Sequence, residues 1–357
     1  MFVFFHDQEL LNLDFFPKVI MTGIPDVPFN TYRMFATNML NKYDRVIVVH
    51  SECNSSQVEW FEQTGAVPVY WWSHALIAQD WFRYANIDPT LDHHWVGPKQ
   101  DFLIYNRAWQ GLREYRLKFT ELVVEHELTQ HCQMKFNPID GQHYYNHQFN
   151  NSAFKISNYQ LENYFPVNTA DSSSSADYCA TDYINTRMEI VLETLFDDQR
   201  WHLTEKTLRP IACGQPFMIA SSAGILKYLR RYGFKTFGEW IDESYDDITD
   251  PMERMHAIIA VMKNIAEMAE SDKDLLFQKM KDTCDYNKKR FFSNEFTNCI
   301  VDEFRQNFDS AADQMKKHQT GAYFKFLMRK LKKYPDRWPA SRQELVKIWQ
   351  TLHSINC

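Results

Sequence analysis

The stretch RVIVVHSECNSSQVEWFEQTGAVPVY, residues 45–70, decides the fold class of this chain. Its opening run RVIVV predicts a buried strand, and the capping residues 53–56 introduce a helix through Val58 and Phe61. Residues 65–70 then return the chain to a strand. Strand, polar turn, helix and strand in this order indicate a βαβ unit of an open α/β sheet.

The residues that follow the predicted strands are candidates for a site, because ligands of open α/β sheets bind beyond the carboxyl ends of the strands. The opening run MFVFF is followed by His6 and Asp7. The next two strands are followed by His50-Ser51-Glu52 and by Trp72-Ser73-His74. We expect these three groups at one edge of the sheet.

A second α/β unit is predicted from Asp101 onward. Residues 102–105 (FLIY) are typical of a strand, and Asn106 can cap a long helix after it. Further strands are predicted at 188–193 and 216–219, a helix at 225–231, and a helical tail from 251. The fold class is therefore α/β, with two Rossmann-like domains facing across a cleft and a helical C-terminal tail. The expected segments are 1–100, 101–265 and 266–357.

The composition is that of a globular protein, with 45% apolar and 24% charged residues among 357. The longest weakly polar stretch, residues 217–229, is shorter than the about 20 residues of a membrane helix. The first residues lack the basic segment of a secretory signal. The seven cysteines are scattered without a C-x-x-C pair, which is typical of reduced thiols. We expect a cytoplasmic location and no membrane span.

The net charge of −7 is unevenly distributed. Residues 1–100 carry 6 Lys and Arg against 11 Asp and Glu, whereas residues 315–350 carry 10 against 2. The basic segment is either the solvated face of a helix or a contact for a polyanion such as DNA. Its cations include Lys316, Lys317, Lys325, Arg329, Lys330, Lys332 and Lys333.

The segment WHLTEKTLRP, residues 201–210, is the most informative for chemistry. Thr204 is a good N-cap, so Glu205 and Lys206 are expected in the first turn of a helix. The N-terminus of a helix favours an anion, Lys206 adds a cation, and the Glu205 carboxylate could accept bonds from two ribose hydroxyls. These features indicate a nucleotide-diphosphate site. The alternative is a capped helix with surface charges.

Several motifs together resemble the nucleotide-sugar site of GT-B glycosyltransferases. T-E-K is followed by PIACGQPFMIA (210–220), LRRYGFKTF (229–237) and IDESYD (241–246), and Tyr105-Asn106-Arg107 opens the second half. The chain is most similar to the fucosyltransferase-like group and to related enzymes often encoded by bacteriophages. The resemblance covers residues 101–130 and 185–262.

The resemblance implies roles for individual residues. Glu205, next to the cap Thr204, would bind the ribose of a UDP- or GDP-sugar, which is a substrate and not a tightly bound cofactor. Lys206 and one arginine would bind the diphosphate, where the planar guanidinium suits an oxyanion. The arginine candidates are Arg107, Arg113 and Arg116. Glu193 is a second candidate for the sugar or nucleotide, unless it only ends a strand. Arg209 and Thr207 are expected to support the site.

The leaving diphosphate would be neutralised by Lys206, an arginine and the helix terminus, which removes the need for a divalent cation. We expect no metal site: Asp272-Lys273-Asp274 is predicted to be solvated surface. His126 and His131 are five residues apart, which places them about 140° apart around a helix at about 100° per residue. They therefore cannot bind one metal ion together on a helix. The general base is expected among Asp7, Glu52 and His74, and we favour Glu52. A retaining enzyme would not need one of them.

The leading functional hypothesis is a glycosyltransferase that moves a sugar from a nucleotide sugar to an acceptor hydroxyl. Related phage enzymes make hydroxymethylated pyrimidine in DNA a candidate acceptor, with the basic segment on the DNA backbone. A glycan, a lipid or a protein are the other acceptors. The rival hypothesis is a non-catalytic α/β binding or structural protein whose basic tail docks nucleic acid or a partner.

Overall fold

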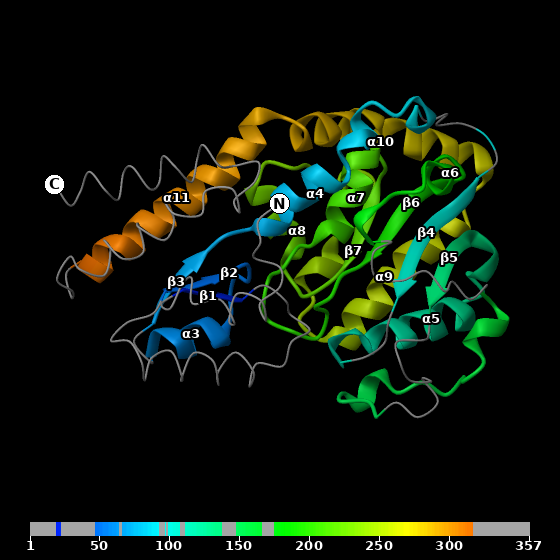
Figure 1. Cartoon of the computed structure of the whole chain (residues 1–357). Helices are drawn as coiled ribbons and strands as arrows, with labels where there is room; N and C mark the ends of the chain where they lie inside the picture. Colours follow the sequence, from blue (N-terminus) through cyan, green and yellow to red (C-terminus); the bar gives the residue numbers. More distant parts are fainter. Residues whose placement is uncertain are drawn as a thin grey trace. The chain divides into compact units, whose positions relative to one another are not determined.

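A computed structural model describes residues 19–22, 47–63, 66–92, 97, 99–107, 111–137, 148–165 and 175–316 (Figure 1). The chain divides into two compact units. The first combines Met1–Ile77 with Thr297–Cys357, and the second is Ala78–Phe296. The segments expected from the sequence divide the chain differently, because residues 78–100 group with the second unit and residues 297–357 with the first.

The first unit contains a parallel sheet of β1 (Val19–Thr22), β2 (Ile47–His50) and β3 (Val67–Tyr70), in that order. Helix α3 (Ser56–Gln63) connects β2 to β3. Every residue of β2 is buried, as a continuous apolar run demands of a strand covered on both faces. The strand–helix–strand prediction for residues 45–70 is thus confirmed. Residues 1–5, the predicted first strand, lie outside the described residues.

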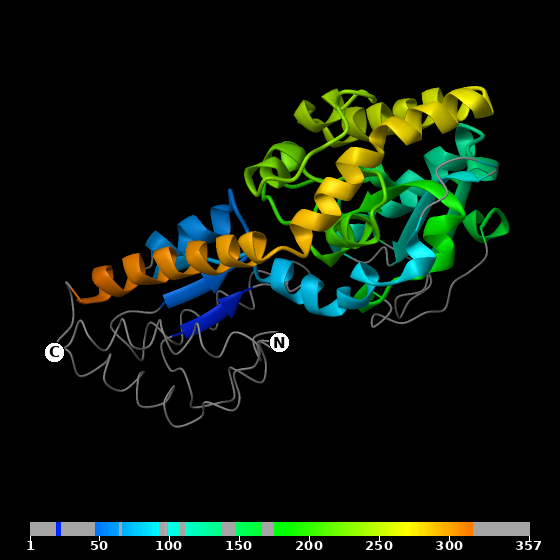
Figure 2. The same ribbon diagram turned by 90° about the horizontal axis from the view of Figure 1, so that it is seen from above.

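Helix α11 (Asn294–Lys316) returns the chain to this first sheet (Figure 2). The ring of Phe304 packs on that of Trp71 with centroids 4.8 Å apart. The side-chain amide of Asn307 donates to the carbonyl oxygen of Tyr70 at 2.9 Å. Residues 297–316 are therefore part of the first unit. Trp71 precedes helix α4 (Ser73–Trp81), which leads out of the sheet.

The second unit is built on a four-stranded parallel sheet with the order β5-β4-β6-β7. The chain enters at the inner strand β4, moves to β5 on one side, and then crosses to β6 and β7 on the other. The strand order therefore reverses between β4 and β6, which is the topological switch point of a doubly wound sheet. The strands are β4 (Gln100–Arg107), β5 (Cys132–Asn137), β6 (Thr186–Leu192) and β7 (Phe217–Ala220).

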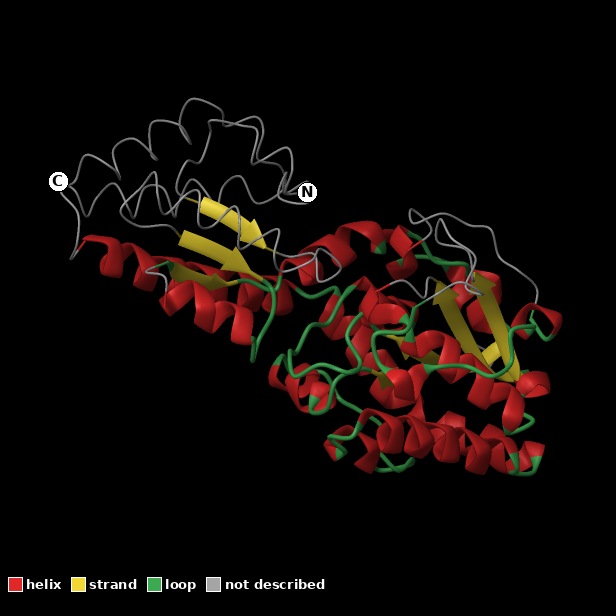
Figure 3. Cartoon of the chain, turned by 90° about the horizontal axis from the view of Figure 1, so that it is seen from below, coloured by secondary structure: helices red, strands yellow, loops and turns green. Residues whose placement is uncertain are grey.

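Helices flank this sheet, as Figure 3 shows by colour. They are α5 (Tyr115–Glu125), α6 (Ala180–Ile184), α7 (Glu205–Cys213), α8 (Ile225–Arg231), α9 (Pro251–Ala266) and α10 (Glu270–Phe291). Short 3-10 helices lie at Arg83–Asn86, Pro89–Leu91, Gly111–Arg113, Thr129–His131, Ser152–Phe154, Leu161–Asn163 and Ser244–Asp247. No helix of the described residues is long and apolar enough to cross a bilayer.

Different helices pack on the two faces of the second sheet. Residues alternate between faces along a strand, and Asn106 of β4 bonds to the carbonyl oxygen of Arg116 in α5 at 3.1 Å. The α5 side therefore also receives the apolar Phe102 and Ile104. On the other face, Glu189 of β6 forms an ion pair with Arg209 of α7 at 2.7 Å. That face therefore carries a buried ion pair among apolar residues such as Leu103 and Phe217, and α7 packs on it.

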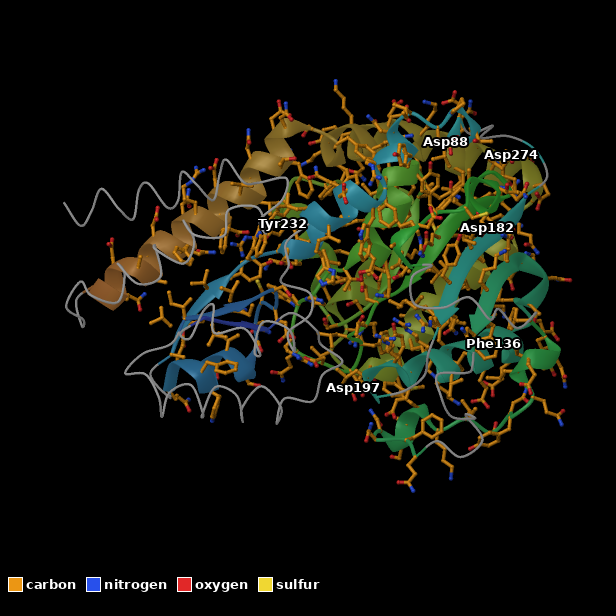
Figure 4. The ribbon with its side chains drawn as sticks, in the orientation of Figure 1. Asp88, Phe136, Asp182, Asp197, Tyr232 and Asp274 are labelled. Atoms are coloured by element: carbon orange, nitrogen blue, oxygen red, sulfur yellow. The ribbon has the colours of Figure 1, made fainter. Side chains whose placement is uncertain are left out.

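Two expectations about this unit are wrong. Asn106 does not cap a helix, because β4 continues to Arg107 and α5 begins only at Tyr115. The tripeptide Asp272-Lys273-Asp274 is not solvated surface as a whole. The ammonium group of Lys273 is buried and contacts Asp101 at 2.8 Å and Glu270 at 3.0 Å. Asp274, labelled in Figure 4, accepts from the buried Arg187 at 2.7 Å.

Candidate functional site

The carboxyl ends of β4 and β6 meet at the switch point of the second sheet. Leu103 of β4 lies opposite Glu189 of β6. Further along, the guanidinium of Arg116 binds the carbonyl oxygens of both Arg107 and Glu193, so the backbone of these two residues lies close together. The sequence-predicted residues Arg107 and Glu193 thus come together where ligands of doubly wound sheets bind.

Arg116 of α5 links the ends of β4 and β6 through hydrogen bonds to their backbone. It is buried, and its guanidinium donates to the carbonyl oxygens of Arg107, Leu192 and Glu193, the last two at 2.7 and 3.0 Å. A guanidinium with three carbonyl acceptors is engaged within the protein. Its position therefore suits a clamp between β4 and β6 better than a contact to phosphate.

Tyr115 forms similar hydrogen bonds, which also reach the end of β7. Its hydroxyl donates to the carbonyl oxygen of Glu193 and lies 3.3 Å from that of Ala220. Burial raises the pKa of Tyr115 to about 12, while the charges of Arg116 and Arg113 pull the pKa the other way. Arg113, half-buried in the 3-10 helix before α5, is thus within electrostatic reach of this edge.

The side chain of Glu193 is fully buried and holds the start of α7. Its carboxylate accepts from the backbone N–H of Thr204 at 3.0 Å and from the Thr204 hydroxyl at 2.8 Å. The Thr207 hydroxyl donates to it at 2.7 Å, and the N–H of Thr194 lies at 3.2 Å. Both oxygens therefore have partners inside the protein.

Helix α7 begins as the sequence predicts. Thr204 is the N-cap, and its hydroxyl accepts from the N–H of Lys206 at 3.3 Å. Glu205 is buried, and its carboxylate pairs with the ammonium group of Lys206 at 2.9 Å. The Lys206 side chain keeps 20% exposure, so it can reach a ligand. Pro210 does not end the helix, which continues to Cys213.

Arg209 lies in the interior, behind this edge. Its guanidinium pairs with Glu189 at 2.7 Å, donates to the Tyr183 oxygen at 3.0 Å and lies 3.9 Å from the centre of the Tyr105 ring. Burial raises the pKa of Glu189, and the nearby Arg209 opposes that rise. These contacts indicate that Arg209 holds α7 against the sheet and does not bind a ligand.

Arg107 is the arginine best placed for a ligand. It is half-buried at the end of β4, and its Nε atom is buried without a hydrogen-bond partner among the described residues. Arg107 ends β4, and Lys206 lies in the first turn of α7 at the same carboxyl edge of the sheet. Such an arrangement favours a bound anion, because the positive end of the helix dipole adds to both charges.

The candidates for a general base belong to the first unit. Glu52 follows the end of β2, is buried, and accepts from the Ser55 hydroxyl at 3.3 Å. His74 is the second residue of α4 and is half-buried. Both follow strand ends, as expected. Asp7 lies outside the described residues.

The remaining expectations concern metals and the basic segment. No group of three or more His, Cys, Asp or Glu side chains in the described part of the chain could hold a metal ion. Lys316 ends α11. The residues Lys317, Lys325, Arg329, Lys330, Lys332 and Lys333 lie outside the described residues, so a DNA contact there stays a prediction.

An open pocket of about 580 Å³ in the second unit contains none of the edge residues. Its lining carries two lysines and two carboxylates, so it shows no preference for an anion. It is formed by Asn86, Asp285, Lys288, Lys289, Phe292, Ser293, Asn294 and Glu295. The geometry of the edge, not this pocket, therefore defines the candidate site.

Two features of the edge were not predicted from the sequence. Tyr115 was not singled out, because a hydroxyl that binds distant backbone carbonyls leaves no spacing in the sequence. Strand β5, whose last residue Asn137 pairs with Arg107, was not predicted either. The alternation in CQMKFN, residues 132–137, was the available signal.

No family model matches this chain, and comparisons with curated proteins and with solved structures found no match. The evidence on function is therefore the geometry and charge of the residues at the edge, together with the sequence motifs.

Proposed function

We propose that this chain is a glycosyltransferase of GT-B architecture that transfers a sugar from a nucleotide sugar to an acceptor hydroxyl without a divalent cation. One observation carries the proposal: the turn Thr204-Glu205-Lys206 opens α7 at the carboxyl edge of a doubly wound sheet, where Glu193 binds Thr204. Arg116 ties Glu193 to the backbone of Arg107 at the same edge. The sequence resemblance to the fucosyltransferase-like group supports the same assignment.

In this proposal Lys206 and Arg107 bind the diphosphate of the donor, and Arg113 adds a third positive charge near the edge. Glu205 binds the ribose hydroxyls. The cations stabilise the negative charge that develops on the leaving diphosphate, and preorganised charge of this kind is a large part of such catalysis. Arg116 and Arg209 do not contact the donor but hold the strand ends and α7 in position.

The ion pair between Lys206 and Glu205 has a consequence for binding. The ammonium group of Lys206 and the carboxylate of Glu205 lie 2.9 Å apart. When the donor binds, the ammonium group turns to phosphate and the carboxylate to the ribose. In this proposal Lys206 contributes to the neutralisation of the buried carboxylate until the donor replaces that contact.

The acceptor would bind to the first unit, where Glu52 is our first candidate for the base. A base that is ionised near neutral pH and within about 3 Å of the acceptor hydroxyl would accept its proton during transfer. The hydroxymethylated pyrimidine of duplex DNA is one acceptor to test, and the basic segment 315–350 would then contact the phosphates.

Calorimetric titration with UDP, GDP and their sugars tests the proposal. We expect micromolar binding, weakened at least tenfold by Lys206→Ala, because the loss of a charge-assisted contact costs about 1.4 kcal/mol or more. Lys227→Ala is the matched control, since Lys227 is an exposed lysine in the next helix α8.

The donor that binds should also be hydrolysed slowly without acceptor, and an acceptor panel that includes hydroxymethylated duplex DNA should accelerate its consumption. If no nucleotide or nucleotide sugar binds the wild-type protein, the proposal is wrong and the non-catalytic α/β binding protein takes its place. Equal losses in Lys206→Ala and Lys227→Ala would remove Lys206 from the site.

A further inference from the structure

Glu193 connects all the elements that meet at the candidate edge. Its backbone carbonyl accepts from Tyr115 and Arg116, so its main chain is tied to α5 and to the end of β4. Its carboxylate accepts from Thr204 and Thr207, so its side chain is tied to the first turn of α7. No other residue of the edge joins the strand ends to that turn through both main chain and side chain in the described structure.

The surroundings of this carboxylate disfavour direct contact with a ligand. The side chain is fully buried, and its oxygens accept four hydrogen bonds from Thr194, Thr204 and Thr207. A hydroxyl of the ligand could bind Glu193 only by displacing one of these donors. A carboxylate beside bound phosphate would also repel it, unless its charge were already engaged as it is here.

We infer that Glu193 is a positioning residue of the proposed donor site, which fixes the Thr204–Thr207 turn against the ends of β4 and β6 without touching the donor. The inference rests on the proposed function for the identity of the ligand. Because Lys206 lies in the fixed turn and Arg107 at the end of β4, Glu193 sets the separation of the two cations. An oxyanion site gains its strength from such preorganisation.

The decisive variant is Glu193→Gln, which keeps the size of the side chain and removes the charge and one acceptor oxygen. The amide nitrogen cannot accept from the N–H of Thr204 or from a threonine hydroxyl. We expect affinity for UDP or GDP, whichever binds the wild-type protein, to fall at least fivefold. Amide hydrogen exchange at residues 204–207 should accelerate by a similar factor.

A double-mutant cycle separates positioning from direct contact. If Glu193 acts by placing Lys206, Glu193→Gln should cause little further loss of affinity in the Lys206→Ala background. Thr207→Val, which removes one bond to the same carboxylate, should weaken binding in the same direction. Thr207→Ser keeps the hydroxyl and should recover most of that loss. This second pair keeps the test valid if Glu193→Gln does not fold.

The outcomes are distinguishable. Unchanged affinity and unchanged exchange in Glu193→Gln would overturn the inference. Independent, additive losses in the cycle with unchanged exchange would also overturn it and make Glu193 a direct ligand. If the wild-type protein binds neither nucleotide, the proposed function fails, while the exchange at residues 204–207 still decides whether Glu193 fixes the turn.

Discussion

The buried ammonium group of Lys273 is balanced by carboxylates from two different elements. Asp101 is the second residue of β4, and Glu270 is the first residue of α10, the helix that also contains Lys273. The ion pair between Lys273 and Asp101 therefore joins α10 to the start of β4. A buried charge is costly when its partner is removed. The charges of Lys273 and Asp272, adjacent in one tripeptide, should therefore differ in their effect on stability.

Lys273→Met should lower the free energy of unfolding by about 3 kcal/mol, the low end for a broken buried pair. The low end applies because Asp101 keeps contacts with Arg187 and His131. Asp272→Ala is the matched control: Asp272 is exposed, and its loss should change stability by less than about 0.5 kcal/mol. Urea unfolding measures both. Equal effects of the two substitutions would contradict the burial of Lys273.

His50 gives the first unit a dependence on pH. The imidazole is buried at the end of β2, with Nδ1 2.9 Å from the carbonyl oxygen of Glu52. Burial lowers the pKa of His50 from 6.5 to about 4. Between these values the unfolded chain binds a proton that the folded protein does not, so the stability contributed by His50 is present above pH 6.5 and is lost as the pH falls toward 4.

The loss linked to His50 is at most about 1.4 kcal/mol for each pH unit in this window. His50→Gln removes the titrating group, so its free energy of unfolding should fall less steeply than that of the wild-type protein between pH 6.5 and 4. Urea unfolding at a series of pH values measures the free energy of unfolding of both proteins. The contributions of the other titrating groups cancel in the difference between them. Parallel curves for the two proteins would show that His50 does not titrate as described.

At the scale of elements, the sequence predicts those whose signal is local. The apolar runs of β2 and β7 and the helix α8, which has the predicted bounds Ile225–Arg231, are found in the structure. The parallel α/β class follows from them. Strand β5 has only a short alternating pattern, and its polar residues Gln133 and Lys135 find their partner, the carboxylate of Asp182, far along the chain.

The start of α5 shows the same limit. Asn106 has the composition of a cap, but hydrogen bonding between β4 and β5 extends as far as the pair Arg107 and Asn137. A pairing partner 30 residues away therefore overrides the local preference. Boundaries set by such contacts cannot be derived from residue types alone.

The candidate site divides in the same way. The cap at Thr204 was predictable, because capping needs only neighbouring residues. The separate roles of Arg107 and Arg116 were not, because Arg116 acts through carbonyl oxygens that lie 76 and 77 residues along the chain. The sequence identified three arginines near the edge, and the structure distinguishes the clamp from the better-placed cation.

At the scale of the whole molecule, the first unit is discontinuous in sequence. It is formed by two segments of the chain, and the second unit is inserted between them. Residues from α11 contact the end of β3 and the segment after it, since Asn307 binds the carbonyl oxygen of Tyr70 and Phe304 packs on Trp71. The first unit therefore depends on residues that the sequence assigns to a separate tail. Its stability should respond to changes in α11.

Phe304→Ala removes the ring that packs on Trp71 and should destabilise the first unit by about 2 kcal/mol, less than a fully buried ring because Phe304 is half-buried. Gln306→Ala, two residues along on the exposed side of α11, is the control. Amide hydrogen exchange in β2 and β3 should accelerate in Phe304→Ala only, with β4 and β6 unaffected, because units with separate cores open separately. Equal acceleration in β4 and β6 would mean that the chain unfolds as one cooperative body. Unchanged exchange in β2 and β3 would instead mean that α11 does not support the first sheet.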